Sequence, residues 1–314
     1  MEEKKMESIV RLAALRISNM KNVEDGRIVM PHFYHRELFH KTAEVLGIYG
    51  QNGSGKTAIV DTLYYLQQIM IGETLSDEIA EYMDVNSEHT EVVADFHIYK
   101  DAFLYEVSYF LVLKKKKKGA EILRETLSCA VNENEKRSKK TVFMDYQRKD
   151  SDVIFLPKKR VDEVVEKNRE LKTDLIVARK LAEKSNCSYI FGESSREIFC
   201  REYDNHFRHC SEVIRALFQF ALKDLFVIRN THSGVISANF LLPMAFKIEK
   251  HQMGVKGDLT IPLTEPVVLK EERKQLLDRI VSQMNTVLYT IIPGMKIDIN
   301  NHGRQMMDDG KEGY

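Results

Sequence analysis

The stretch Gly50-Gln51-Asn52-Gly53-Ser54-Gly55-Lys56-Thr57 satisfies the pattern G-x-x-x-x-G-K-[ST], and the apolar run VLGIY at 45–49 directly precedes it. This pattern is typical of a phosphate-binding loop between a strand and a helix. Behind the loop, apolar side chains recur at helical spacing, at Ala58, Ile59, Leu63 and Leu66. The sequence therefore predicts a strand over 45–49, a loop over 50–57 and a helix to about Met70.

The residue types in the loop fit a nucleoside triphosphate. Glycines leave room for backbone N–H groups to approach phosphate oxygens, and the start of the following helix favours an anion. Lys56 is expected against the β- and γ-phosphates, and the Thr57 hydroxyl as a magnesium ligand. The predicted ligands are ATP and Mg²⁺, and the predicted nucleotide-binding residues are Gly50, Gln51, Asn52, Gly53, Ser54, Gly55, Lys56, Thr57 and Ala58.

Two alternatives stay open for this loop. A glycine-rich turn can match the pattern by chance. The loop reads phosphates and not bases, so GTP is the other candidate ligand; the absence of the N-K-x-D motif of GTPases favours ATP.

Composition limits the class of protein. With 314 residues, of which 43% are hydrophobic, the chain can bury a large core. No apolar run approaches the roughly 20 residues that cross a bilayer, and the charged start lacks the apolar stretch of a signal peptide. We therefore expect a cytoplasmic protein without a membrane segment. Cysteines at 129, 187, 200 and 210 have no C-x-x-C spacing, which predicts free thiols.

Charge is balanced, with 47 basic and 47 acidic side chains, so a wholly polyanion-binding surface is not expected. Three basic runs remain, at 114–118, 136–140 and 158–160. A charge run at a strand end or turn is usually a solvated loop. The other interpretation is contact with a nucleic-acid backbone, above all through Lys114, Lys115, Lys116, Lys117 and Lys118.

The spacing of apolar residues changes along the chain and indicates different kinds of secondary structure. Before the loop, residues 10–18 and 27–30 are predicted to pair as antiparallel strands around a turn at 24–26. From Thr90 onward, apolar residues occur at every second position. This spacing predicts an antiparallel meander with strands over 92–98, 103–113 and 122–131.

After Pro157 the pattern is helical and charged to Asn186, which predicts a long amphipathic helix or arm, and a second helical block covers 195–225. An extended stretch at 258–266, a helix at 271–288 and a strand at 295–299 follow. The predicted domains are a nucleotide-binding lobe at 1–157, a helical insertion at 158–257 and a return to the core at 258–314.

Four segments together resemble a known family: LRISNMKN at 15–22, GIYGQNGSGKT at 47–57, ILRETL at 122–127, and VL at 287–288 with IIPG at 291–294. They resemble the head domains of ABC-type ATPases related to chromosome-maintenance and DNA-repair ATPases. The likeness is closer to the bacterial AAA-family ATPases of the abortive-infection and overcoming-lysogenization-defect group.

The resemblance implies an α/β P-loop NTPase of ABC-head type with an antiparallel β meander and a helical insertion. It implies an ATP-binding ATPase domain in phage defence or DNA maintenance, a dimer with itself or an ATPase partner, and an effector protein as a further partner. In that family the segment after the first strand touches the nucleotide, which points to Lys21 and Asn22 here. A glutamine ahead of the insertion contacts magnesium, and Gln147 is the candidate; an exposed loop glutamine is the alternative.

The catalytic residues stay unassigned. An acidic strand motif is needed to hold the magnesium shell, and the runs at 223–229 and 152–157 place their acids before the strand. The family's serine-glycine signature and histidine switch are also not found. In the family these motifs lie beyond the part matched by 292–294, so we expect the chain to match the N-terminal part of a longer ATPase. The alternatives are a non-hydrolysing, nucleotide-dependent interaction module and a nucleic-acid-binding protein.

A zinc site is the last alternative considered. Four residues of the right ligand types lie within a short stretch, at Cys200, His206, His209 and Cys210. Their spacing does not close a tetrahedron, so we expect a packed helix with partly buried cysteines and solvated histidines.

Overall fold

The computed structural model describes residues 8–34, 44–100, 103–133, 136–148, 167–200 and 208–230, with short strands and separate positions beyond them. Two compact units divide the chain, Met1–Ala238 and Asn239–Tyr314. This division differs from the predicted boundaries at 157 and 257, because the helices after the meander belong to the same unit as the sheet. The first unit also contains the loop at 50–57.

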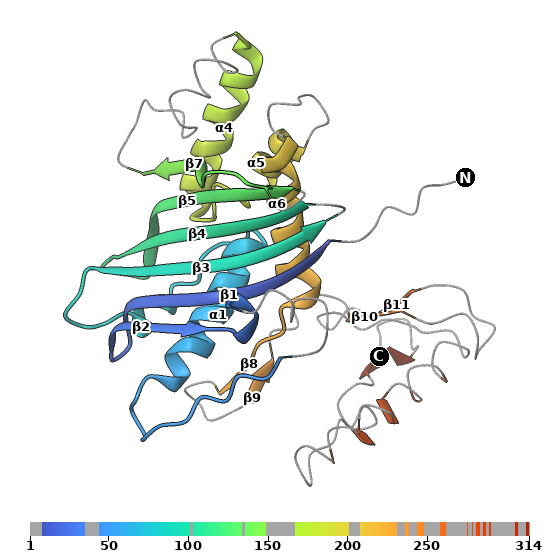
Figure 1. Cartoon of the computed structure of the whole chain (residues 1–314). Coiled ribbons are helices and arrows are strands. Elements are labelled where there is room, and N and C mark those ends of the chain that lie inside the picture. The colour runs from blue at the N-terminus through green and yellow to red at the C-terminus, as the bar shows by residue number, and fades with distance from the viewer. Residues whose placement is uncertain are drawn as a thin grey trace. The chain divides into compact units, whose positions relative to one another are not determined.

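The first unit is built on an antiparallel sheet, which confirms the predicted meander and the mixed α/β class (Figure 1). All pairings among its described strands are antiparallel, and the main order is β2-β1-β3-β4-β5, with β6 and β7 both on β5. The strands are β1 Ile9–Met20, β2 Val23–Val29, β3 His89–Lys100, β4 Phe103–Lys115, β5 Ala120–Glu133, β6 Lys136–Arg137 and β7 Thr141–Gln147.

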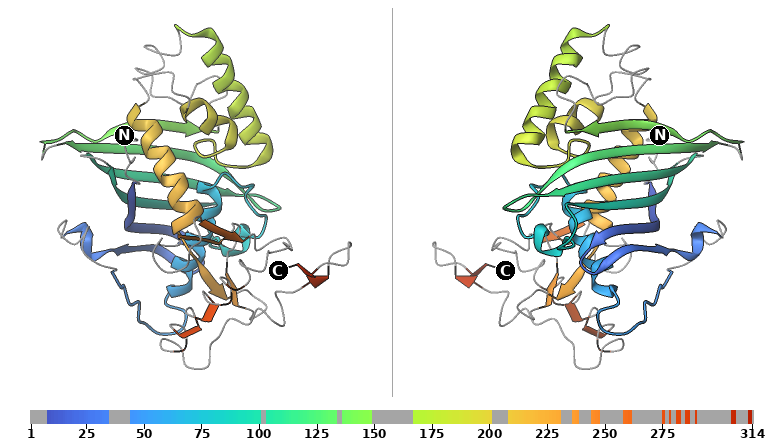
Figure 2. Two further views of the ribbon diagram at one scale, coloured as in Figure 1. Left: turned by 90° about the vertical axis from the view of Figure 1, so that its right-hand side faces the viewer. Right: turned by 90° about the vertical axis from the view of Figure 1, so that its left-hand side faces the viewer.

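Helices cover one face of this sheet. The predicted helix behind the loop is confirmed as α1 Lys56–Met70, and α6 Arg208–Gln219 continues into a π-helical turn, Phe220–Asp224. Figure 2 shows α6 crossing the strands. The Gln67 amide of α1 donates to the Ala221 carbonyl at 3.0 Å, so the two helical segments pack side by side against the buried strand residues.

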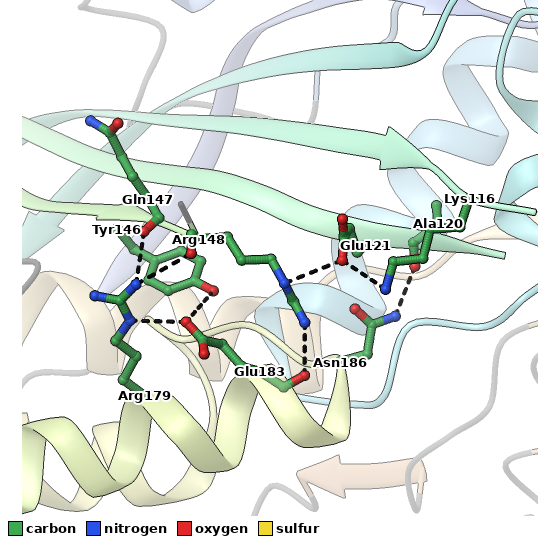
Figure 3. A network of polar contacts seen from close by, with 9 residues as sticks. All are labelled: Lys116, Ala120, Glu121, Tyr146, Gln147, Arg148, Arg179, Glu183 and Asn186. Atoms are coloured by element: carbon green, nitrogen blue, oxygen red, sulfur yellow. Dashed lines mark hydrogen bonds and ion pairs between the residues drawn. The ribbon is translucent and has the colours of Figure 1, made fainter. Parts of the chain in front are cut away.

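Helix α4, Arg169–Ser185, lies along the β7 edge, and α5, Glu193–Cys200, follows it. A polar network joins α4 to the sheet (Figure 3). Arg148 pairs with Glu121 at 3.2 Å and donates to the Glu183 carbonyl at 3.0 Å, while Arg179 donates to the Gln147 carbonyl at 3.0 Å. From Leu175 onward, the predicted helical arm is therefore packed against the body of the unit, whereas the first turn of α4 is largely exposed.

The remaining described elements are short. In the first unit they are the 3₁₀ turn Pro31–Phe33, α2 Ile79–Tyr82, and the pair β8 Ile228–Asn230 with β9 Ile236–Ala238. In the second unit β10 Met244–Lys247 pairs with β11 Asp258–Ile261, and β12 Gln305–Met306 with β13 Glu312–Gly313. Within the predicted helix at 271–288, the few described positions are helical. The predicted strand at 295–299 lies outside the described residues.

The predicted turn at 24–26 is wrong. The chain reverses at Lys21 and Asn22, and residues 24–26 continue β2. Asn19 and Lys21 adopt left-handed φ angles of 58° and 53°, which lets the strands reverse early. Asp25 and Gly26 then pair with Ser18 and Ile17 of β1, so the backbone is extended where a turn was expected.

The predicted strand at 45–49 is also wrong. Residues 44–50 have no regular secondary structure, and the side chains of Val45 and Tyr49 are 89% and 94% exposed. A strand requires a hydrogen-bonded neighbour. No described strand pairs with this segment, so its apolar pattern alone does not form one.

One carboxylate lies inside the core. Glu125 of β5 is fully buried and accepts hydrogen bonds from the Tyr109 hydroxyl at 2.6 Å, the Ser188 hydroxyl at 2.6 Å and the Tyr189 N–H at 2.7 Å. Burial raises the pKa of Glu125 above its ordinary value, although these hydrogen bonds oppose the shift. Glu125 therefore fixes the segment before α5 beneath the sheet.

Replacing Glu125 with alanine should lower the free energy of unfolding by about 3 kcal/mol, because buried donors lose their acceptor. The folded carboxyl binds a proton more readily than the unfolded one, so its contribution to stability should fall as pH rises from the ordinary pKa of 4.5 through the folded-state pKa. Urea unfolding of wild type and Glu125→Gln between about pH 4 and about pH 8 measures this. A stability difference that does not change with pH would contradict it.

Candidate phosphate-binding site

The glycine-rich loop ends in a tight turn at the start of α1. Gly53 and Gly55 have φ angles of 82° and 86°, a backbone region that L side chains avoid. The Ser54 N–H donates to the Gln51 carbonyl at 3.2 Å, and the Ala58 N–H to the Gly55 carbonyl at 3.0 Å. Residues 50–54 are exposed, whereas Gly55 and Ala58 are buried, so the accessible part of the loop lies just before the N-terminus of α1.

Lys56 lies inside the curve of this loop. Its Nζ is 2.7 Å from the Gly50 carbonyl oxygen, 2.7 Å from the Gln51 carbonyl oxygen and 3.4 Å from the Ser54 hydroxyl. The neighbouring Thr57 is exposed in the first turn of α1. The structure thus places the Lys56 ammonium against the loop carbonyls and leaves Thr57 exposed beside it.

A cavity of about 260 Å³ lies between the β1–β2 hairpin and the loop. Gly50, Ser54, Gly55 and Lys56 line it on the loop side. Its other walls are mostly apolar, formed by Leu15, Ile17, Val23, Ile28, Ile48 and Ile59, with Arg27 and Tyr49 as the larger polar residues. None of the described residues that line it is acidic.

The structure brings Asn22 to the loop but directs Lys21 elsewhere. The Asn22 amide donates to the Gly53 carbonyl. The Lys21 ammonium forms an ion pair with Asp61 on α1 and lies 4.9 Å from the centre of the Tyr82 ring. Of the two residues predicted to touch a nucleotide, only Asn22 contacts the loop.

Asp61 was not predicted from the sequence. Its side chain is 4% exposed, and its second partner is Arg229 at 3.5 Å. The Arg229 guanidinium lies 3.6 Å from the centre of the Tyr64 ring. A single acid among the apolar positions of a helix is the only local signal of such a residue, and its partners are distant in sequence.

The structure does not bring Gln147 to the loop. Gln147 ends β7, where its amide donates to Asp145 at 3.1 Å. Strands β3, β4 and β5 separate β7 from β1, which corresponds to roughly 19 Å at ordinary strand spacing. A magnesium role for Gln147 has no support from this position.

The basic runs do not form one surface. Lys116 pairs with Glu121 at 2.7 Å and Lys118 with Asp77 at 3.5 Å, although residues 116–118 are exposed. The run at 114–118 and the run at 136–140 lie at opposite ends of β5, a strand of 14 residues that spans about 45 Å. The run at 158–160 lies outside the described residues.

The zinc alternative gains no support. His206 and the side chain of Cys200 lie outside the described residues. Cys210 is buried, and His209 Nδ1 lies 3.1 Å from the Tyr105 hydroxyl, so this histidine is packed rather than solvated as expected. Within the part of the chain that the structure describes, no group of three potential metal ligands occurs, and Cys129, Cys187 and Cys210 form no disulfide.

These observations define a mixed α/β protein with an antiparallel sheet and a glycine-rich loop at the N-terminus of a helix. No protein-family model matches the chain, and a search of curated proteins finds no relative. None of the helices in the described residues is long and apolar enough to span a membrane.

Gly53 and Gly55 offer a matched pair of substitutions, since both have left-handed φ angles. A Cβ on Gly53 meets open space, whereas one on Gly55 would overlap the Val23 Cγ2 methyl. Gly53→Ala should therefore cost about 1 kcal/mol of backbone strain, and Gly55→Ala should cost more. Urea unfolding of both variants measures the difference; equal costs would contradict the close packing of Gly55 on Val23.

Proposed function

We propose that this chain binds ATP with Mg²⁺ through the loop at 50–57. The observation that carries the proposal is the position of Lys56, whose ammonium is held by two loop carbonyls at the start of α1. The phosphates of ATP are stronger partners for an ammonium than carbonyls are. On binding, Lys56 would turn to them and Thr57 would be a ligand of Mg²⁺. The mostly apolar cavity beside the loop would receive the nucleoside.

We further propose the P-loop NTPase fold of ABC-head type. The glycine-rich loop followed directly by α1 and the resemblance of the four segments support this proposal.

Hydrolysis is proposed to depend on motifs from outside the described residues, in a longer chain or a partner subunit. The lining of the cavity has no carboxylate, and Asp61 is engaged by Lys21 and Arg229. Without such motifs the chain would be a non-hydrolysing, nucleotide-dependent interaction module. A dimer, an effector partner and a role in phage defence or DNA maintenance are proposals that rest on the resemblance alone.

Lys56→Ala should weaken Mg-ATP binding by about a hundredfold, because it removes the charge nearest the phosphates. Lys117→Ala is the matched control, since it removes the same charge from an exposed turn. Titration of a fluorescent ATP analogue, competed with ATP, measures both affinities, and phosphate release measures hydrolysis. Equal affinity in wild type and Lys56→Ala would refute the assignment.

Nucleic-acid binding is the second candidate function, favoured by the exposed lysines 116–118 at the β4–β5 turn. If these lysines contact phosphates, replacing all three with alanine should reduce the slope of log affinity against log salt by about 2 to 3. Fluorescence anisotropy with labelled single- and double-stranded DNA measures the slope. An unchanged slope would exclude this turn as the contact.

A further inference from the structure

We propose that the turn between β1 and β2 positions the phosphate-binding loop, with Asn22 as the residue that orients the backbone of the loop and Asp61 as the residue that ties the turn to α1. The inference deepens the proposed function and rests on it. It assigns Asn22 and Asp61 as positioning residues, distinct from groups that contact the nucleotide.

The turn is held in a strained conformation by several contacts. Asn19 and Lys21 have left-handed φ angles, and such strain persists only where surrounding structure over-determines it. The Lys21 N–H donates to the Tyr82 carbonyl at 2.6 Å. The Asn19 carbonyl accepts from the Thr90 hydroxyl at 2.8 Å, and the Asn19 amide donates to the His89 carbonyl at 3.1 Å. These hydrogen bonds therefore hold the turn in one conformation.

The β1–β2 turn contacts the loop through two consecutive residues, Asn22 and Val23. The Asn22 amide donates to the Gly53 carbonyl, and Val23 lies so close to Gly55 that any Cβ there would overlap it. The peptide unit is planar and trans, so a Gly53 carbonyl that faces Asn22 turns the Ser54 N–H in the opposite direction. That N–H donates to the Gln51 carbonyl, across the loop. Asn22 thus fixes the orientation of the peptide unit between Gly53 and Ser54 and supports the hydrogen bond that closes the loop.

Asp61 connects the same turn to the helix that carries Lys56. Its carboxylate lies in α1, little more than one turn beyond Lys56, and pairs with Lys21 next to Asn22. Arg229 of β8 is its second partner. Removing one member of a buried charge cluster is costly, so the turn and α1 are held in one arrangement. The side of the loop touched by Asn22 and the side that carries Lys56 therefore keep a fixed separation.

The test compares two variants of Asn22 with a matched control. Asn22→Ala removes the side chain, and Asn22→Asp keeps its shape but removes the donor. Asn86→Ala is the control, because Asn86 is also an exposed asparagine in a turn. The first readout is amide hydrogen exchange of Ser54 without nucleotide, and the second is the Kd for Mg-ATP. Urea unfolding tests whether each variant remains folded.

We expect Asn22→Ala and Asn22→Asp to speed exchange at Ser54 by about three- to tenfold, because each variant loses the stabilisation of one hydrogen bond. The free energy of global unfolding should change little. Asn22→Ala should weaken Mg-ATP binding by a similar factor, and Asn86→Ala should change neither readout. Asp61→Asn should show the same loosening of the loop, but its burial makes it less stable, so the Asn22 variants decide the question.

The two proposals can fail separately. If wild type does not bind Mg-ATP, the proposed function fails, while faster Ser54 exchange in both Asn22 variants still supports the positioning role. If wild type binds Mg-ATP and the Asn22 variants leave both Ser54 exchange and the Kd unchanged, the positioning role is overturned and the proposed function stands.

Discussion

The close packing of the β1–β2 turn against the glycine-rich loop is the constraint on which the candidate site depends. Val23 leaves no space for a side chain at Gly55, and Asn22 bonds to the carbonyl of Gly53. The cavity beside the loop exists because the hairpin forms one wall and the loop the other. Lys56 follows the turn at Gly55 directly, so its position depends on the same packing.

Two buried carboxylates stabilise the first unit in different ways. Asp61 is surrounded by cations, Lys21 and Arg229, and joins segments that are far apart in sequence. Glu125 accepts only from neutral hydroxyl and N–H donors, so burial raises its pKa. Asp61 thus fixes the surroundings of the loop, while Glu125 fixes the packing of the segment before α5. Neither carboxylate lines the cavity beside the loop.

Features encoded by local pattern could be predicted from the sequence. The loop at 50–57, helix α1 and the strands of the meander each carry their signal within a short window, as glycine spacing, period 3.6 or period two. The predicted strand at 45–49 has a suitable composition but lacks the neighbour that a strand requires. The turn at 24–26 was misplaced, because the chain already reverses at Lys21 and Asn22 and residues 24–26 pair with β1.

Some site residues could likewise be predicted from a local motif, whereas others depend on contacts between distant parts of the chain. Lys56 and the loop glycines follow from the motif, whereas Gln147 was assigned by its order along the chain, and β3, β4 and β5 separate it from β1. Asp61 could not have been found locally, since its role depends on Lys21 and Arg229. Long-range ion pairs leave no periodic signal, and only the three-dimensional arrangement identifies them.

The measurement that tests the central claim most directly is backbone hydrogen exchange of the wild-type chain with and without Mg-ATP. If the loop binds the phosphates, the amides of residues 50–57 should exchange more slowly with nucleotide present, because phosphate oxygens would accept their hydrogens. Unchanged exchange over 50–57 at saturating Mg-ATP would contradict the account.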